Sequence, residues 1–224
     1  DSPVTGVQTC ALPILCRVLG DLVQTGGVAK IADDLYCGGE TVDELLSVWE
    51  SVLHRLDNAN LKLRANKTVV LPAKTAILGW IWENGYLRAD PHKISTLSIC
   101  ARPTTTKGLR SFIGAYKVLA RVLPSCATLL RPLDRATHGK KSADRIVWDE
   151  STIDAFEKAQ KHLANNKAIV LPKESDQLWL ITDGASSTRG LGATLYALRD
   201  GKLLLAGFFS QQLSPSYTKW FPCE

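Results

Sequence analysis

Apolar residues follow two different spacings along this chain, and together the spacings predict an α+β fold. Short β-prone runs at residues 28–32 and 35–37 flank the acidic pair Asp33-Asp34, which is the pattern of a tight hairpin. Further strands are predicted at residues 61–71 and 77–82. Asn84-Gly85 then favours a hairpin turn into Tyr86-Leu87.

Helical spacing appears in the middle of the chain. A capping box at Thr41 and Glu44 opens the first predicted helix, whose apolar face runs to Leu56. A second helix is predicted from near Thr105 to Pro124, and a shorter helical stretch at residues 127–130. A further helix follows Asp149, and the polar run at residues 137–145 between these helices predicts a linker.

The pattern returns to strands after residue 176. Three strands are predicted, at residues 178–181, 192–198 and 202–209, with Asp200-Gly201 joining the last two. We therefore expect the chain to end in a three-stranded antiparallel sheet.

Composition changes this picture little. Hydrophobic residues make up 45% and charged residues 22%, as in ordinary globular proteins. The apolar runs are too short to cross a bilayer, so we expect no membrane partner and an intracellular, cytoplasmic location. The net charge of +5 fits a phosphate-bearing partner. The six cysteines are scattered without zinc-ligand spacing, which indicates free thiols.

The first fourteen residues stand apart from the rest. Residues 4–14 (VTGVQTCALPI) look like the conceptual translation of a sequencing adapter, and they show no periodicity. We interpret residues 1–14 as an artefact; a natural flexible tail is the alternative.

Two groups of carboxylates could carry chemistry. Asp33 and Asp34 at a hairpin tip could hold Mg²⁺, which prefers rigid oxygen ligands. They could equally be a solvated turn. Asp183 follows a buried-strand pattern and precedes small residues, so it is either a metal ligand or an ordinary strand end. The residues alone indicate no more than metal-dependent phosphoryl chemistry.

The order of segments resembles the pol polyprotein of gypsy-like LTR retrotransposons. Residues 31–34 (IADD) resemble the two-aspartate hairpin of reverse transcriptases, and residues 61–67 (LKLRANK) the palm motif that follows it. Residues 78–94 are similar to the primer-grip region. Residues 109–133 look like the thumb helices.

The resemblance continues into ribonuclease H. Trp148-Asp149 and Ala155-Phe156 resemble the segment that leads into that domain. Residues 182–186 (TDGAS), 191–195 and 208–214 are similar to its opening strands. Glu224 falls at the position of the family's second ribonuclease H carboxylate.

This resemblance implies a division of the chain into four parts after the artefact. Residues 15–90 would be the C-terminal part of the palm and residues 91–147 the thumb and connection. Residues 148–175 would be a helical lead-in, and residues 176–224 the N-terminal part of a ribonuclease H-like domain. The implied fold is a partial palm hairpin and helical thumb, followed by a truncated three-stranded sheet.

The resemblance also implies roles for individual residues. The parent protein would be an RNA-directed DNA polymerase with ribonuclease H, acting with dNTPs on an RNA template and an RNA/DNA hybrid. Its cofactor would be Mg²⁺ in two-metal sites that are incomplete here. The implied metal ligands are Asp33, Asp34, Asp183 and Glu224, and Lys67 would lie near the departing pyrophosphate. Residues implied to contact nucleic acid are Leu78, Gly79, Trp80, Tyr86, Arg110 and Lys117.

Two positions depart from the family pattern. Ile31 stands where the family usually has an aromatic residue, and Gly184 is an insertion after the ribonuclease H aspartate. We expect the chain as written to catalyse neither reaction, because each metal site would lack carboxylates.

Two other readings stay open from sequence. The chain could be a non-catalytic nucleic-acid-binding remnant of a domesticated or decayed element, with basic residues such as Lys62, Arg64 and Arg121 holding phosphates. It could also be a relic that is never a stable protein.

Overall fold

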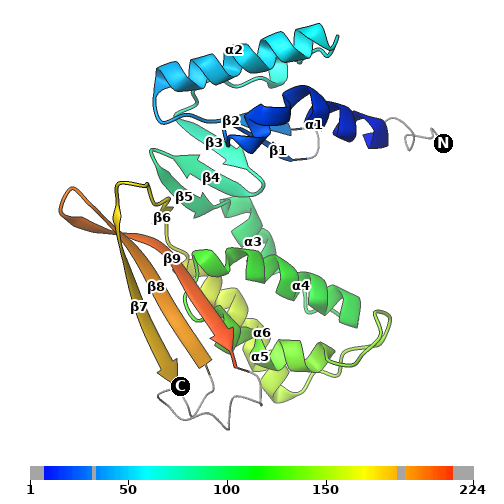
Figure 1. Cartoon of the computed structure of the whole chain (residues 1–224). Coiled ribbons are helices and arrows are strands. Elements are labelled where there is room, and N and C mark those ends of the chain that lie inside the picture. The colour runs from blue at the N-terminus through cyan, green and yellow to red at the C-terminus, as the bar shows by residue number, and fades with distance from the viewer. Residues whose placement is uncertain (1–7, 32–33, 186–189, 214–224) are drawn as a thin grey trace. The chain divides into compact units, whose positions relative to one another are not determined.

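A computed structural model describes residues 8–31, 34–185 and 190–213 of the 224-residue chain (Figure 1). The chain divides into two compact units, Asp1–Val70 and Leu71–Glu224. Each unit mixes helices with strands, which confirms the predicted α+β class.

The first unit is a hairpin between two helices. Strands β1 (Val28–Ile31) and β2 (Asp34–Cys37) pair in antiparallel fashion, as the sequence predicts. Helix α2 (Val42–Asn58) begins at the expected capping box, where the Glu44 amide donates to Thr41 Oγ1 at 3.2 Å. Helix α1 (Gln8–Gln24) was not predicted, and it begins inside the segment that the sequence analysis sets aside.

This unit has a small apolar core of its own. Leu19, Val28, Val52 and Leu56 are buried together, so α1, β1 and α2 share one core. Arg55 of α2 is ion-paired with Asp21 and donates to the Leu19 carbonyl at 3.2 Å. The core and these bonds hold both helices to the hairpin.

The predicted strand at residues 61–71 is wrong. The segment contains a single 3-10 turn, η1 (Ala65–Lys67), and none of its residues belongs to a described strand. The Lys67 amide donates to the Arg64 carbonyl and the Thr68 amide to the Ala65 carbonyl. These are the bonds of a local turn and not of a strand pair.

A four-stranded sheet opens the second unit, in the order β3-β4-β5-β6. The predicted single strand at residues 77–82 is in fact two, β3 (Lys74–Ile77) and β4 (Trp80–Glu83), divided by a turn at Leu78-Gly79. Strand β5 (Tyr86–Ala89) follows the Asn84-Gly85 turn as expected. The short strand β6 (Ile169–Val170) was not predicted.

Four helices follow the hairpin in the chain. Helix α3 (Pro91–Ile99) was missed from sequence, although Asp90 caps it and proline occupies its first turn. Helix α4 (Thr106–Val118) begins near Thr105 as predicted, with Thr105 as its N-cap, and continues into η2 (Leu119–Arg121). The short predicted stretch at residues 127–130 is a full helix, α5 (Cys126–Thr137), with Pro132 inside it. Helix α6 (Glu150–His162) begins after Asp149 as predicted and leads into η3 (Leu163–Asn165).

Helices α4, α5 and α6 enclose the main core. Its largest buried side chains include Phe112, Tyr116 and Phe156. The rings of Phe112 and Phe156 lie 4.6 Å apart, and Trp148 packs edge-on against Phe156 at 5.5 Å. The buried Tyr116 hydroxyl is 3.0 Å from His162 Nδ1, which gives this polar atom a partner inside the core. Burial lowers the pKa of His162, and burial also raises the pKa of Cys126 to about 12.

The predicted linker at residues 137–145 is irregular but closely held. The Thr106 amide donates to the Asp144 carbonyl at 2.8 Å, and the Lys107 amide donates to the Ser142 carbonyl at 2.9 Å. The Arg110 guanidinium donates to the carbonyls of Thr137 and Lys140. These bonds fold the segment back onto α4, so it does not separate two domains.

The last sheet has the predicted three antiparallel strands. They are β7 (Gln177–Ala185), β8 (Gly190–Arg199) and β9 (Lys202–Gln212), in the order β7-β8-β9. The turn between β8 and β9 is at Asp200-Gly201, where both residues have positive φ, as a two-residue hairpin of this type requires.

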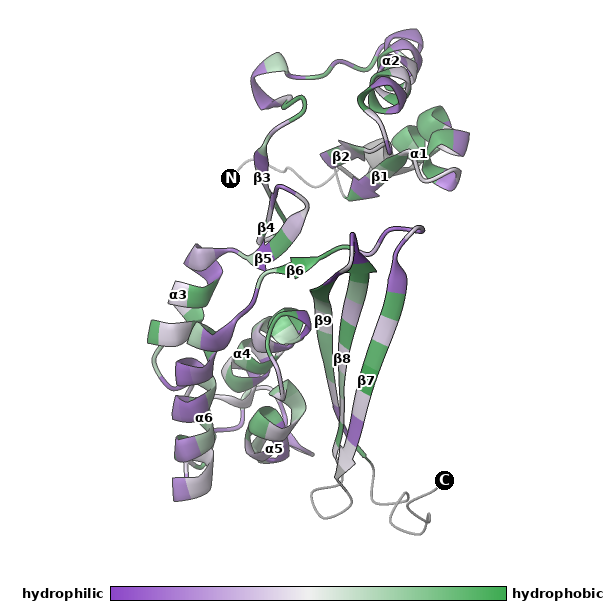
Figure 2. Cartoon of the chain, turned by 90° about the vertical axis from the view of Figure 1, so that its left-hand side faces the viewer, coloured by the Kyte–Doolittle hydropathy of each residue, from purple (hydrophilic) through white to green (hydrophobic). Residues whose placement is uncertain are grey.

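Strand β7 lies at the edge of this sheet and is poorly covered. Leu178, Trp179, Leu180 and Ile181 are consecutive and all between 51% and 65% exposed. Consecutive strand residues point to opposite faces, so β7 exposes apolar surface on both. Figure 2 shows hydrophobic residues along β7, which is the strand of this sheet farthest from the helices. In the part of the chain that the structure describes, no helix is long and apolar enough to cross a membrane.

Replacing a core leucine of the helical layer should destabilise the second unit strongly. Leu130 of α5 is fully buried, so Leu130→Ala leaves a cavity and should cost about 3 kcal/mol of the free energy of unfolding. Val118→Ala on α4 is the matched control, because Val118 is 52% exposed and should change stability by less than about 0.5 kcal/mol. Native-state hydrogen exchange of α4 and α5 amides measures both. Equal protection in the two variants would contradict this core.

Candidate functional site

The β1–β2 hairpin presents the first candidate carboxylate. Ile31 pairs with Asp34 at the end of the hairpin. Asp33 lies outside the described residues. Asp34 begins β2 and is exposed. The pKa of Tyr36, two positions on, is raised by burial of the tyrosine and by the negative charge of Asp34. One described carboxylate therefore stands at the hairpin tip.

Lys67 was predicted to lie near the departing pyrophosphate. It is exposed and lies in η1, close to the C-terminal end of the first unit. The structure gives it no contact with Asp34. Its predicted role near a departing pyrophosphate stays a prediction.

The four hairpin residues predicted to contact nucleic acid lie at both ends of β4. Leu78 and Gly79 form the β3–β4 turn, while Tyr86 pairs with Glu83 at the far end. A strand of this length separates the two ends by about 10 Å. Leu78 and Tyr86 are 56% and 44% exposed, whereas Trp80 is half-buried against the helical core. The hairpin thus offers two exposed contact points on one rigid support.

Arg110 and Lys117 project from α4, and both side chains already have partners. Arg110 donates to Thr137 and Lys140 carbonyls, at 2.9 and 2.8 Å. Lys117 Nζ pairs with Asp134 Oδ1 at 3.0 Å, with both side chains about half exposed. Such surface pairs contribute little and exchange readily with other partners.

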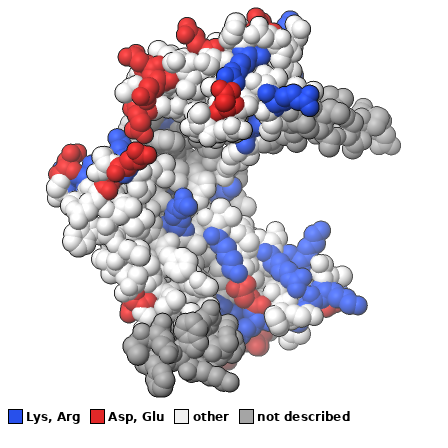
Figure 3. Space-filling model, in the orientation of Figure 1, with Lys and Arg blue, Asp and Glu red and all other residues white. Residues whose placement is uncertain are grey.

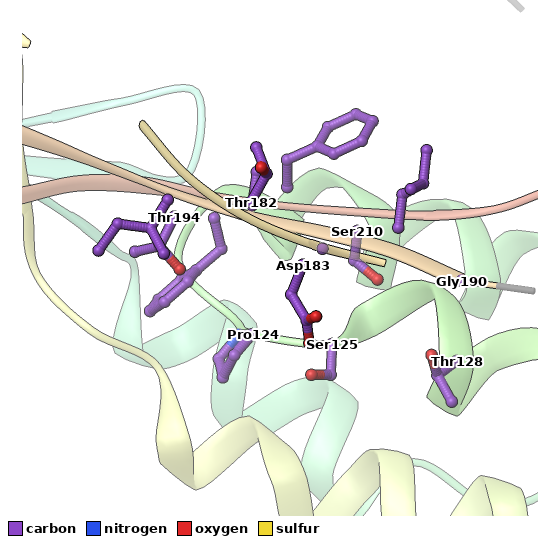
Figure 4. A pocket seen from close by; sticks show the side chains of 14 residues that line it. Pro124, Ser125, Thr128, Thr182, Asp183, Gly190, Thr194 and Ser210 are labelled. Carbon is purple, nitrogen blue, oxygen red and sulfur yellow. The ribbon is translucent and has the colours of Figure 1, made fainter. Parts of the chain in front are cut away.

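Asp183 is the carboxylate with the best-defined surroundings. It lies on β7 in register with Gly192 of β8 and, through it, with Ser210 of β9. Its side chain points toward Ser125 at the start of α5 (Figure 4). A cavity of about 290 Å³ lies between this face of the sheet and α5, and its lining includes Pro124, Ser125, Thr128, Asp183 and Ser210.

The sheet supplies part of the cap of α5 at this cavity. Ser125 precedes the helix with φ +54°, and its hydroxyl makes no capping bond. Instead, the Ala127 amide donates to Ser210 Oγ at 3.0 Å. Ser210, which lies on β9 opposite Gly192, thereby connects the sheet to the start of α5. The positive end of the helix dipole faces a site that contains a carboxylate, a favourable arrangement.

A buried ion pair sets the position of β7. Arg199 at the end of β8 donates to both carboxylate oxygens of Asp176, at 2.9 and 2.6 Å, and to the Leu171 carbonyl at 3.1 Å. The Asp176 side chain is 2% exposed, and the Arg199 guanidinium and the Lys173 amide lower its pKa to about 2. Asp176 is the residue directly before β7, so the ion pair joins the start of β7 to the end of β8.

The described side chains do not by themselves form a metal site. Among the described residues, no three His, Cys, Asp or Glu side chains gather closely enough to hold a metal ion. Glu224, the predicted second carboxylate beside Asp183, lies outside the described residues. Each candidate site has a single carboxylate among the described residues, and one carboxylate does not hold a metal ion by itself.

Sequence reasoning missed several residues that shape these sites. Ser210 and the Asp176–Arg199 pair act across distances of 22 residues or more in the chain, and no local pattern announces them. The Leu78-Gly79 turn did carry a signal, because glycine in a strand pattern often marks a turn or bulge.

The chain is similar in sequence to polyproteins of retroelements. It is 25% identical over 222 residues to the retrovirus-related Pol polyprotein from transposon opus of Drosophila melanogaster, covering 94% of this chain. It is 23% identical to the Pol polyprotein from transposon gypsy of the same species over 84% of this chain, and 25% identical to the Gag-Pol polyprotein of Gibbon ape leukemia virus over 87%. The chain spans 22%, 20% and 11% of these relatives. No family model matches.

Solved structures show the same fold. The foamy viral protease-reverse transcriptase in complex with dsDNA matches 99% of this chain with a TM-score of 0.77 and 18% identity, over 45% of its own length. The same protein in complex with an RNA/DNA hybrid matches 100% of this chain with a TM-score of 0.75 and 16% identity, over 29% of its length.

Asp176→Asn should lower the melting temperature and change how stability depends on pH. The Asp176 pKa is lowered from 3.8 to about 2 in the folded protein, so the ion pair stabilises the fold fully above about pH 4 and loses its effect as the pH falls toward 2. The melting-temperature difference between the variant and the unmodified chain should be constant from about pH 5 to 7 and shrink below pH 4.

Asp200→Asn is the matched control for this charge change. Asp200 is exposed in the β8–β9 turn with φ +51°, a conformation that asparagine tolerates well. Thermal melts of both variants across this pH range decide the matter. A difference for Asp176→Asn that stays constant down to pH 2 would contradict the assigned role of the ion pair.

Proposed function

We propose that this chain, a relative of the Pol polyproteins of gypsy-like LTR retrotransposons and retroviruses, is a segment of a reverse transcriptase that runs into its ribonuclease H domain. The observation that carries the proposal is the fold match over essentially the whole chain, with the acidic hairpin, the helical layer and the last sheet all included. The relatives are longer, since the chain spans 22% of the opus polyprotein. Activity therefore belongs to the proposal for the longer protein.

The proposed division follows the sequence prediction. Residues 15–90 belong to the palm, residues 91–147 to the thumb and connection, and residues 148–175 to the lead-in. Residues 176–224 begin the ribonuclease H domain. The three-stranded order β7-β8-β9 and the position of Asp183 on its edge strand support the last assignment.

The proposed substrates are nucleic acids: an RNA template, an RNA/DNA hybrid and dNTPs. Charge supports this class of partner. Residues 104–145, which contain α4 and α5, hold nine lysine and arginine side chains and two carboxylates. Figure 3 shows Lys and Arg gathered over the surface of these helices and the loop that follows. We call residues 104–145 the basic segment. A surface of this kind attracts phosphates by releasing their counterions.

The proposed chemistry is metal-dependent phosphoryl transfer. In the longer protein, Asp33 and Asp34 would hold Mg²⁺ for polymerisation, with Lys67 nearby, and Asp183 and Glu224 would hold Mg²⁺ for hybrid cleavage. Bound Mg²⁺ would activate an oxygen nucleophile and neutralise the charge that develops on the phosphate. The described residues supply one carboxylate to each site, so we propose that others in the longer protein complete them.

The purified chain should bind an RNA/DNA hybrid with a steep dependence on salt. Removing two cations of the basic segment, Lys107→Gln with Lys141→Gln, should reduce the slope of log affinity against log salt by about 1 to 2 and weaken binding at every sequence tested. Both side chains are exposed, so the fold should persist. Fluorescence anisotropy with a labelled hybrid at several salt concentrations measures the effect.

Lys158→Gln with Lys161→Gln is the control pair. These two lysines are exposed on α6, outside the basic segment. Their substitution removes the same amount of positive charge as the first pair of substitutions. An equal loss of affinity for the hybrid would show a non-specific charge effect and not binding by a defined surface.

The chain as written should catalyse neither reaction. Incubated with Mg²⁺, dNTPs and a primed RNA template it should extend no primer, and it should leave a labelled hybrid intact, because each proposed two-metal site lacks carboxylates that the longer protein would supply. Gel analysis of primer and hybrid tests both. Hybrid binding without turnover also fits a non-catalytic binding remnant, and the flanking sequence separates the two, since an active parent needs further carboxylates in frame. Magnesium-dependent extension by the chain alone would contradict the proposed division of each site.

A further inference from the structure

The turn between β3 and β4 is held in an unusual conformation. Ile77 pairs with Trp80, so the loop consists of Leu78 and Gly79 alone. Both residues have positive φ, +52° and +80°, as a two-residue hairpin of this twist requires. Leucine adopts this conformation rarely, so contacts outside the turn must hold it.

The first turn of α3 supplies these contacts. The Asp90 amide donates to the Gly79 carbonyl at 3.1 Å. Lys93 Nζ donates to the Leu78 carbonyl at 3.0 Å. Both carbonyls of the turn are therefore bonded to the start of one helix, which Asp90 caps through the His92 amide.

The Lys93 side chain also lies directly over Gly79. A Cβ atom added to Gly79 would be 2.0 Å from Lys93 Cε, 2.1 Å from Nζ and 2.5 Å from Cδ. These are the outer atoms of a flexible side chain, so an added methyl group would displace the lysine and not the backbone. Displacement would break the bond to Leu78. Gly79 is thus needed for space as well as for its positive φ.

We propose that Lys93 is a positioning residue that fixes the Leu78-Gly79 turn in the shape that contacts nucleic acid. The inference rests on the proposed function and on the prediction that Leu78 and Gly79 contact the bound nucleic acid. It assigns Lys93 a role that acts through the turn, with its ammonium group bonded to the Leu78 carbonyl. The side chain is exposed, so this bond and not burial is what holds it in place.

Three variants of the full 224-residue chain separate this role from simple charge. Lys93→Met keeps most of the side-chain length and removes the donor, and Lys93→Arg restores a donor. Gly79→Ala should expel Lys93 from the turn. Lys161→Met, at an exposed position of α6, controls for loss of one positive charge.

The first readout needs no nucleic acid. Amide hydrogen exchange at Gly79 and Trp80 should quicken about three- to tenfold in Lys93→Met, as expected for loss of one charge-assisted hydrogen bond, and recover in Lys93→Arg. Gly79→Ala should have an effect of similar size. Exchange in the double variant, Lys93→Met with Gly79→Ala, should be no faster than in the faster of the two single variants, because both changes break the same bond. Unchanged exchange in Lys93→Met would overturn the proposal.

The second readout is the affinity for an RNA/DNA hybrid at several salt concentrations. Lys93→Met should weaken binding about three- to tenfold while leaving the salt slope unchanged, since a positioning residue releases no counterion. If Lys93→Met reduced the slope of log affinity against log salt by about 1 and left amide exchange at the turn unchanged, Lys93 would be a direct phosphate contact. That result would overturn the proposal. Lys161→Met should leave the exchange and the affinity as they are. If the unmodified chain binds no hybrid, the proposed function fails, whereas the exchange measurement still decides the Lys93–turn contact.

Discussion

Burial of a single apolar cluster among α4, α5 and α6 is the constraint on which the second unit depends. Both sheets of this unit are attached through it. Ala89 of β5 and Ile169 of β6 are buried in the same cluster as Phe112 and Phe156, and Leu205 of β9 packs against it. The β3–β4 turn and the sheet face that carries Asp183 are therefore both attached to one helical layer. Loss of that layer would release the β3–β4 turn and the Asp183 face together.

Local rules predicted the elements whose signals are local. The capping box at Thr41, the helix start near Thr105 and the turn at Asp200-Gly201 lie where the sequence places them. The errors have physical reasons. A strand needs a partner, and residues 61–71 find none among the described residues. Pro132 suggested an end to α5, yet the helix continues through it to Thr137.

The candidate sites show the same division between local and distant information. The sequence placed Asp34 in the hairpin turn and Asp183 just after a buried strand, whereas Asp34 begins β2 and Asp183 lies within β7. The prediction that the strand before Asp183 is buried was wrong, because residues 178–181 are exposed at the edge of the sheet. What surrounds the two aspartates could not be predicted. The Ser210 bond to the Ala127 amide and the Lys93 bond to the Leu78 carbonyl join elements that only the tertiary fold brings together. Asp33 and Glu224 lie outside the described residues, so their placement stays a prediction.

The pairing of β6 with β5 dictates an order of events during synthesis. Tyr86 pairs with Val170, so the four-stranded sheet closes only after the ribosome has added about eighty further residues, which takes roughly 4 to 16 s. During that interval the outer edge of β5 stands without its last partner strand. Helices α4 to α6 are made within the same interval. A nascent chain that stalls there exposes an unpaired β edge, which is the kind of surface that chaperones bind and that drives misassembly.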